Sequence, residues 1–200
     1  MKKFLLIFSI ITISVISIMT VFDVIVMNIN YSYNMQIWEE KNYSGVIYKQ
    51  SDFPDIKFGV GNVAKNGCGA VSIYNILALD NKPEKLPDII KKLDVFGETA
   101  FGLLGAKPFS VINILKQYGY KVKYSFNTNE FDSLAQNSRY AIYLYIGQTK
   151  DVVTGHYQLL TDYNKETQQY QLYSPYYQST MRNLLEYTEG CFIKVLITVN

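Results

Sequence analysis

The pattern of apolar and polar positions separates an apolar N-terminal run from a longer region of mixed helix and strand signals. The run Phe4–Phe22 holds 19 uncharged residues, follows Lys2 and Lys3, and is interrupted by Asp23. About 20 apolar residues cross a bilayer as a helix, and this run lacks the polar face of a buried core helix. Basic residues before such a run favour a cytoplasmic N-terminus. We therefore expect residues 1–28 to be an uncleaved signal anchor, with the following domain outside the cytoplasm.

A cleaved signal peptide is the second interpretation of this segment. Cleaved signals have a shorter apolar region of about 7–15 residues and end in small residues such as Ala-x-Ala, a pattern not found here. Cleavage would make the protein secreted. Residues 29–55 are polar and aromatic, with few helix signals. They are expected to form a connector with one or two short strands, such as Gly45–Gln50.

Residues 56–200 show helical spacing first and strand patterns afterwards. Helical spacing predicts helices at Ala70–Leu79, Leu86–Val95, Pro108–Tyr118 and Glu130–Asn137. Strands are predicted at Lys121–Phe126, Tyr140–Ile146, His156–Tyr163, Gln168–Ser174 and Cys191–Val199. The polar turn Asn164–Thr167 joins two of these strands into a hairpin. This order predicts one α+β domain, with N-terminal helices packed on an antiparallel sheet.

Composition and charge narrow the function classes. Hydrophobic residues make up 48% and charged residues 18% of the chain, which favours a packed core over disorder. The net charge is +2 and no basic cluster is interleaved with aromatics, so nucleic-acid binding is not expected. One histidine and two distant cysteines lack the ligand spacing of a zinc site. The Gly97–Gly105 loop lacks the Gly-Lys-Ser/Thr of a phosphate loop, and no cofactor is expected.

Cys68 is the candidate nucleophile. It lies between Gly67 and Gly69, directly before an apolar helical run. Free N–H groups and the helix dipole favour a thiolate at such a position, and the flanking glycines would leave the sulfur uncovered. A buried structural cysteine also fits the pattern. Cys191 is expected in the last strand as a core residue, and a Cys68–Cys191 disulfide in an oxidising compartment would abolish the nucleophile.

His156 is the candidate base, since a cysteine nucleophile needs a group that holds the thiolate and the chain has one histidine. If the hairpin turn is centred near Lys165, Ser174 lies opposite His156 and within cross-strand reach. Its hydroxyl would orient the imidazole without adding a charge. Asp162 lies six strand residues from His156, roughly 20 Å along an extended strand, which is too far.

An acyl-transfer site also needs hydrogen-bond donors for the oxyanion. The backbone N–H of Cys68 is one candidate. Asn62, six residues before Cys68, is the candidate side-chain donor. Asn66 is closer but fits a turn-forming asparagine better.

Three motifs together carry a resemblance. Asn66-Gly-Cys-Gly-Ala-Val-Ser-Ile-Tyr-Asn75, then Gly155-His-Tyr157, then Tyr173-Ser-Pro175 resemble the papain-like cysteine peptidases. The chain is most similar to the bacteriocin-processing, double-glycine leader peptidase group and its standalone relatives, over roughly residues 56–199. That group has a Gln six residues before the Cys, a Cys-Gly opening a helix, a Gly-His before a strand and an Asp-Pro after the next strand. The resemblance implies a papain-like fold, preceded here by one transmembrane helix.

The resemblance also implies roles for individual residues. Cys68 matches the nucleophile and His156 the base. Asn62 takes the place of the oxyanion Gln, and Ser174 takes the place of the orienting Asp. Asn is one methylene shorter than Gln, and Ser lacks a carboxylate.

The expected function is that of an extracytoplasmic, membrane-anchored cysteine peptidase acting on a peptide or protein substrate. Cys68 would attack a peptide carbonyl, His156 would hold and return the proton, and water would hydrolyse the acyl-enzyme. The alternative is a catalytically weak or inactive papain-like domain that binds a peptide or a partner protein. A third interpretation is a structural or immunity-type membrane protein in which Cys68 is only a core residue.

Overall fold

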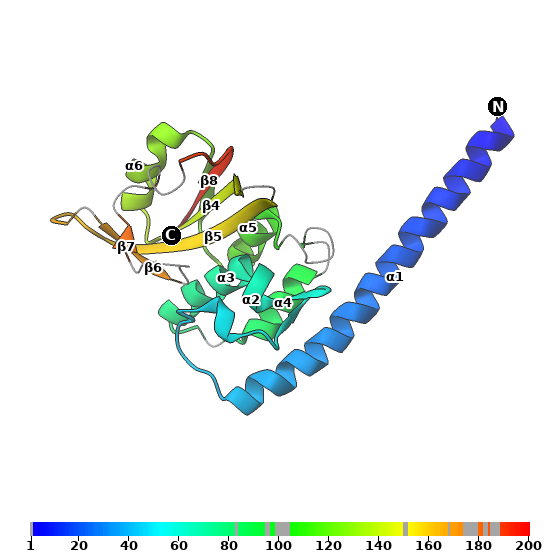
Figure 1. Cartoon of the computed structure of the whole chain (residues 1–200), viewed down its shortest axis with the longest axis horizontal. Helices are drawn as coiled ribbons and strands as arrows, with labels where there is room; N and C mark the ends of the chain where they lie inside the picture. Colours follow the sequence, from blue (N-terminus) through cyan, green and yellow to red (C-terminus); the bar gives the residue numbers. More distant parts are fainter. Residues whose placement is uncertain are drawn as a thin grey trace.

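A computed structural model shows one long helix attached to a domain of helices packed on an antiparallel sheet (Figure 1). It describes residues 2–82, 84–94, 97–98, 105–149, 152–167, 169–173, 180–181, 184 and 189–200. The α+β arrangement expected from the sequence is confirmed.

Helix α1 (Lys2–Lys41) is long and apolar enough to cross a membrane. The sequence predicted that this segment ends near residue 28. The helix instead continues to Lys41, through much of the expected connector at residues 29–55. Residues 45–50 form no strand; this irregular stretch leads into the 3-10 helix η1 (Gln50–Asp52). The reason is that the second half of α1 buries side chains against the domain, including Met27 and Trp38. Tertiary packing therefore extends the helix beyond the segment with strong apolar character.

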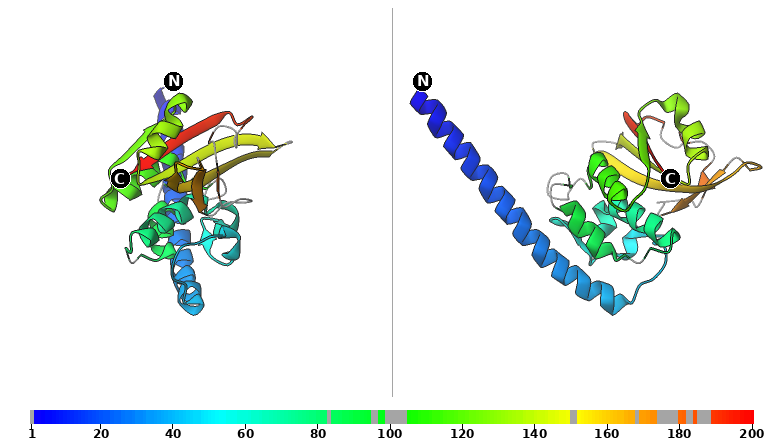
Figure 2. Two further views of the ribbon diagram at one scale, coloured as in Figure 1. Left: turned by 90° about the vertical axis from the view of Figure 1, so that its left-hand side faces the viewer. Right: turned by 180° about the vertical axis from the view of Figure 1, so that it is seen from behind.

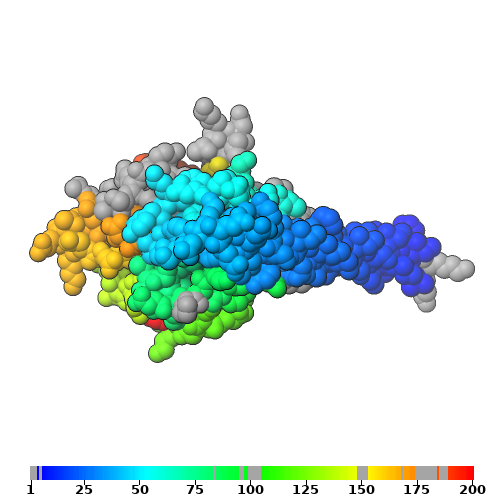
Figure 3. Space-filling view, turned by 90° about the horizontal axis from the view of Figure 1, so that it is seen from below, coloured from blue at the N-terminus to red at the C-terminus, as the bar shows by residue number. Residues whose placement is uncertain are grey.

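The second half of α1 is fixed to the domain by specific contacts. The buried Asn34 accepts a hydrogen bond from the Lys57 backbone N–H at 2.7 Å and donates to the Lys57 carbonyl at 2.8 Å. Asn30 donates to the Gly59 carbonyl at 2.7 Å. Trp38 packs on Tyr74 with ring centroids 5.4 Å apart. Figure 3 shows α1 lying across the domain and then projecting away from it toward the N-terminus.

The remaining helices are α2 (Val63–Asn66), α3 (Cys68–Leu79), α4 (Leu86–Asp94), α5 (Pro108–Gln117) and α6 (Phe131–Gln136), the last preceded by the 3-10 helix η2 (Thr128–Glu130). Four of them, α3 to α6, lie close to their predicted positions, while the short helix α2 was not predicted. Ten of the twelve residues of α3 are buried, so α3 is the central helix of the domain.

The main sheet has the strand order β3-β8-β4-β5-β6-β7, with every neighbouring pair antiparallel. Its strands are β3 (Val122–Ser125), β4 (Tyr140–Thr149), β5 (Val152–Asn164), β6 (Gln169–Tyr173), β7 (Thr180–Met181) and β8 (Ile193–Val199). A second, two-stranded sheet is formed by β1 (Lys57–Phe58) and β2 (Gly61–Asn62).

The main sheet has a hydrophobic core on each face. One core joins α3, α4 and α5 to residues such as Leu144, Tyr157 and Leu159. The other joins α6 to residues such as Tyr143 and Leu160. Since successive residues of a strand point to opposite faces, these two cores assign the side chains of β4 and β5 to a face.

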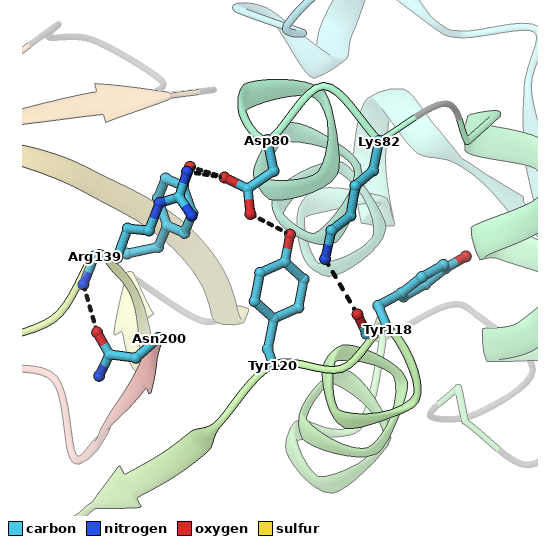
Figure 4. A network of polar contacts seen from close by, with 7 residues as sticks. Asp80, Lys82, Tyr118, Tyr120, Arg139 and Asn200 are labelled. Carbon is cyan, nitrogen blue, oxygen red and sulfur yellow. Dashed lines mark hydrogen bonds and ion pairs between the residues drawn. The ribbon is translucent and has the colours of Figure 1, made fainter.

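A polar network ties the end of α3 to the sheet (Figure 4). Asp80 accepts hydrogen bonds from the hydroxyls of Tyr120, at 2.7 Å, and Tyr140, and forms an ion pair with Arg139. The Arg139 backbone N–H donates to the side chain of Asn200 at 2.8 Å. Burial acts to raise the pKa of Asp80, but the Tyr140 and Tyr120 hydrogen bonds and the Arg139 charge outweigh it, so the pKa is lowered.

Candidate functional site

Cys68 is the first residue of α3, as expected. The short helix α2 and Gly67 lead directly into it. A Cβ atom on residue 67 would lie 2.7 Å from the Cα of Val63, so only glycine fits this junction. Gly67 thus has a packing role at the turn that carries Cys68.

The sulfur of Cys68 is covered, in contrast to the expectation of an open nucleophile. Cys68 is only 6% exposed. A Cβ atom on Gly69 would lie 3.0 Å from the Ala106 Cβ and 3.4 Å from the Tyr157 ring. The Tyr157 hydroxyl donates to the Ala106 carbonyl at 2.8 Å. The missing side chain of Gly69 therefore makes room for Tyr157, not for a substrate.

Burial raises the pKa of the Cys68 thiol, and the backbone N–H groups of Tyr157, Gly69 and Cys68 oppose this only in part. Burial, and then the charge of the Cys68 thiolate, raise the pKa of Tyr157 as well. Both groups are therefore neutral at physiological pH. Two neutral neighbours cannot form the ion pair that activates a thiol nucleophile.

His156 lies on the other face of the sheet. It pairs across the strands with Tyr145 of β4, and the two rings lie 5.8 Å apart. Tyr145 packs in turn on Tyr143, which belongs to the core on the α6 side. The His156 side chain is 3% exposed and is therefore buried on that side.

The direction of the His156 side chain does not favour the Cys68–His156 pair that the sequence interpretation required, and this pair stays a prediction. Tyr157 is the residue of β5 that faces α3, and adjacent strand residues point to opposite faces. The sequence correctly predicted that the cysteine helix packs near the histidine strand.

Asn62 is the N-cap of α2, and its side-chain oxygen accepts a hydrogen bond from the Lys65 backbone N–H at 3.1 Å. Asn66 ends the same helix. The capping bond gives Asn62 a local structural role. Its expected part in an oxyanion site stays a prediction.

Ser174 lies outside the described residues. The register that placed it opposite His156 is nevertheless wrong, because it would pair residue 159 with residue 171. In the structure Leu159 pairs with Tyr173. The observed register is therefore offset by two residues from the predicted one, because the innermost pair, Asn164 and Gln169, places the turn further along the chain than Lys165; a β-bulge between Thr161 and Asn164 then changes the pairing by one residue.

The two cysteines are both free thiols, so the structure contains no Cys68–Cys191 disulfide. Cys191 is half-buried and precedes β8, which begins at Ile193. Its sulfur lies 2.8 Å from where a Cβ of Gly147 would be. Glycine at position 147 therefore makes room for Cys191.

A carboxylate pair that the sequence interpretation missed lies where α1 meets the domain. Asp94 and Glu98 line a cavity of about 10 Å³ together with Phe22, Asp23 and Val60. Burial and then the Glu98 charge raise the pKa of Asp94 to about 8, while burial and then the Asp23 charge raise that of Glu98 to about 7. Within the described part of the chain, no group of three His, Cys, Asp or Glu residues is arranged to hold a metal ion. A side-chain hydrogen bond between the two carboxyl groups also affects both pKa values, raising that of Asp94 and lowering that of Glu98, so the pair is best described as sharing a proton.

Comparison with known proteins gives no match to a protein-family model or to a curated protein sequence. The solved structures with some similarity to the chain include peptidase domains. The peptidase domain of Streptococcus ComA, a bifunctional ABC transporter involved in a quorum-sensing pathway, has 10% identity and a TM-score of 0.47, covering 66% of this chain and 89% of that chain. The same domain from Streptococcus mutans in complex with a small-molecule inhibitor has 10% identity and a TM-score of 0.43, covering 68% and 93%. Alone, the Streptococcus mutans domain has 10% identity and a TM-score of 0.41, covering 72% and 99%.

Proposed function

We propose that this protein is a membrane-anchored domain of cysteine-peptidase-like architecture that binds a peptide or partner protein and cleaves it weakly or not at all. The observation that carries the proposal is the orientation of β5, which turns Tyr157 toward Cys68 and His156 toward the opposite face. The Cys68 helix still packs on the histidine strand, as in the papain-like resemblance. We infer that the peptidase-like architecture is kept while His156 is turned away from the nucleophile position.

The chemistry of Cys68 supports this proposal. A catalytic base must lie within about 2.6–3.2 Å of the proton that it removes, or reach it through one water. Next to Cys68 the structure has the neutral phenol of Tyr157, whose hydroxyl is engaged with the Ala106 carbonyl. With its raised pKa, the Cys68 thiol stays protonated at neutral pH. A protonated, covered thiol is a poor nucleophile.

The apolar part of α1 supports anchoring in a membrane. Large apolar side chains are exposed at consecutive positions such as Ile10 and Ile11, so the helix has no apolar stripe reserved for a protein partner. A helix that is apolar on all sides fits a lipid environment. Lys2 and Lys3 precede the run, and we propose that they keep the N-terminus in the cytoplasm and the domain outside.

Thiol alkylation of the full chain tests the catalytic part of the proposal. In a Cys191→Ser background, iodoacetamide reports on Cys68 alone. We expect slow alkylation with an apparent pKa at or above about 8.5, unchanged by His156→Ala. Tyr157→Ala should accelerate the reaction by uncovering the sulfur. Rapid alkylation below neutral pH that disappears in His156→Ala would show an armed Cys–His pair and would refute the proposal.

A peptide mixture tests binding separately from cleavage. The full chain in lipid nanodiscs is incubated with peptides from a digested proteome, and retained and cleaved peptides are identified by mass spectrometry. Wild type and Cys68→Ala should retain the same peptides and leave them intact. Cleavage by wild type that Cys68→Ala abolishes would contradict the proposal, and failure of both proteins to retain any peptide would limit it to partner proteins.

The second candidate is an active peptidase that uses Cys68 and His156. It is favoured by the position of Cys68 at the start of α3, where the N–H groups of Gly69 and Tyr157 lower the thiol pKa. A shift of β5 by one residue would exchange the faces of His156 and Tyr157. The same shift would exchange Leu159 and Leu160 between the two cores and carry the polar Gln158 to the α3 face, which makes this candidate the costlier one.

A further inference from the structure

The domain exposes an unusual set of large apolar side chains. Excluding α1 and Tyr48, the large apolar residues described as exposed are Val60, Phe109, Tyr124, Phe126, Val153, Phe192 and Ile193. Phe126 and Phe192 are 61% and 60% exposed. Contiguous apolar surface on a water-soluble domain commonly marks an interaction site, so their distribution over the fold is informative.

Three of these residues lie at one end of the main sheet. Val153 is the second residue of β5, Ile193 is the first residue of β8, and Phe192 directly precedes it. The Phe192 backbone N–H donates to the Ile146 carbonyl near the end of β4, which joins the two sites. Figures 1 and 2 show this end of the sheet on the side of the domain that faces the N-terminal half of α1.

An aromatic cluster joins α5 to the edge strand β3. Phe109 and Tyr124 have ring centroids 5.6 Å apart, and Tyr124 and Phe126 have centroids 5.8 Å apart. All three rings remain exposed. Figures 1 and 2 show α5 on the same side of the domain as this end of the main sheet. Val60 joins this side, because it lines the cavity that also contains Phe22 of α1.

The contacts of α1 fix how this side is oriented toward a membrane. Asn30, Asn34 and Trp38 hold the second half of the helix on the domain. The apolar run ends at Phe22, and its 19 residues span about 28 Å as a helix, close to the ~30 Å of a hydrocarbon core. The bilayer surface therefore lies near Asp23, level with the side of the domain that carries the exposed apolar residues.

We infer that this side of the domain rests on the surface of the bilayer that α1 spans, with its aromatic rings at the level of the lipid headgroups. The inference rests on the anchoring part of the proposed function. Aromatic rings are enriched at this depth because they are apolar with a polar edge or hydroxyl. The domain is then held flat against the membrane instead of moving freely at the end of a tether, and its partner is met at the membrane surface.

Tryptophan fluorescence in vesicles with brominated lipids tests the inference. Bromine on the acyl chains quenches an indole that reaches the bilayer. The single native tryptophan, Trp38, is buried in the domain and gives a constant background. The full chain is reconstituted in phosphatidylcholine–phosphatidylglycerol vesicles with and without dibrominated phosphatidylcholine, as the variants Phe192→Trp, Phe126→Trp, Ile13→Trp and Tyr48→Trp.

The four variants separate insertion of α1 into the bilayer from contact of the domain surface with lipid. Ile13→Trp lies in the exposed apolar half of α1 and reports whether the helix is in lipid. Tyr48→Trp is the matched control, because Tyr48 is exposed but stacks on Tyr173 of β6, away from the N-terminal half of α1. We expect clear quenching for Ile13→Trp, Phe192→Trp and Phe126→Trp, with a blue-shifted emission, and none for Tyr48→Trp.

The possible failures are distinguishable. If Ile13→Trp is quenched while Phe192→Trp and Phe126→Trp behave like Tyr48→Trp, the anchor stands and the membrane-resting face is refuted. If Ile13→Trp is not quenched, the anchoring proposal itself fails, and the inference fails with it. Equal quenching of all four variants, Tyr48→Trp included, would show unspecific adsorption and would also overturn the inference.

Discussion

The two faces of β5 are filled in different ways. On the α3 face, Tyr157 fits over Gly69 and bonds to the Ala106 carbonyl. On the α6 face, His156 packs edge-on against the ring of Tyr145. On the first face, the Tyr157 ring fills the space left by the missing side chain of Gly69. On the second face, His156 belongs to a row of packed rings that includes Tyr145 and Tyr143. The comparison teaches that the fit at Gly69, more than the chemistry of His156, fixes which residue of β5 lies beside Cys68.

The largest expected effect comes from removing the ring on the α3 face. Tyr157→Ala should lower the free energy of unfolding by about 3–5 kcal/mol, because it leaves a cavity in a close-packed core. Thermal or chemical denaturation measures this. Tyr157→Phe is the matched control and should cost only about 0.5–1.5 kcal/mol, the value of the hydrogen bond to Ala106. Equal losses in the two variants would mean that the ring is not packed as described.

Filling the space at Gly69 is the next largest change. Gly69→Ala should destabilise the fold by about 1–3 kcal/mol, because the new Cβ would lie 3.0 Å from the Ala106 Cβ and 3.4 Å from the Tyr157 ring. Gly-to-Ala in an open helical position normally stabilises by up to about 1 kcal/mol, so the sign of the effect is diagnostic. A stabilised Gly69→Ala protein would show that Tyr157 does not pack there.

The polar network at Asp80 affects the α3 face of the sheet, because it links the end of α3 to Tyr140 at the start of β4. Asp80→Asn should cost about 1–3 kcal/mol at neutral pH. Because the folded-state pKa of Asp80 is lowered, its carboxylate stabilises the fold above about pH 4, and this stabilisation is lost as the pH falls further. Urea denaturation of wild type and variant should therefore differ at pH 7 and converge in acid. A constant difference would contradict the assignment.

The smallest expected effect is a gain, at the carboxylate pair beneath α1. The pKa of Asp94 is raised from 3.8 to about 8 in the folded state, so wild-type stability should fall as the pH rises between about 4 and 8. Asp94→Asn removes this titration and should be more stable than wild type at pH 9, by about 1–2 kcal/mol. Denaturation curves across this range check it, and a variant that is less stable at pH 9 would refute the shared proton.

The sequence predicted the helices well where apolar spacing was strong, as in α3 and α5, and the α+β order followed from them. It failed where long-range packing decides. The second half of α1 is helical because Asn34 and Trp38 contact the domain, which no local pattern reveals. The hairpin register differs from the predicted one by two residues because the turn lies between Asn164 and Gln169 and not around Lys165, and a one-residue bulge follows it; neither feature has a clear local signal.

The candidate site shows the same limit. Cys68 was placed correctly, because a glycine-flanked residue before an apolar run marks a helix start. The face of His156 depends on whether the odd or even residues of β5 contact α3. The spacing of Tyr157 and Leu159 carried that signal, since two apolar residues at strand period lie on one face. Gln158 and His156 lie on the opposite face of β5, and both are buried although they are polar. A simple apolar–polar pattern therefore does not show which face of β5 contacts α3.

Disulfide trapping tests the central claim most directly, because a disulfide forms only between cysteines whose Cα atoms lie within about 7 Å and whose side chains face each other. In a Cys191→Ser background, the full chain carries Tyr157→Cys or His156→Cys together with the native Cys68, and is treated with a mild oxidant. Intact mass with and without reductant reports the bond. The account predicts a reversible disulfide to Cys68 in the Tyr157→Cys protein and none in the His156→Cys protein. A disulfide in the His156→Cys protein alone would place His156 beside Cys68 and contradict the account.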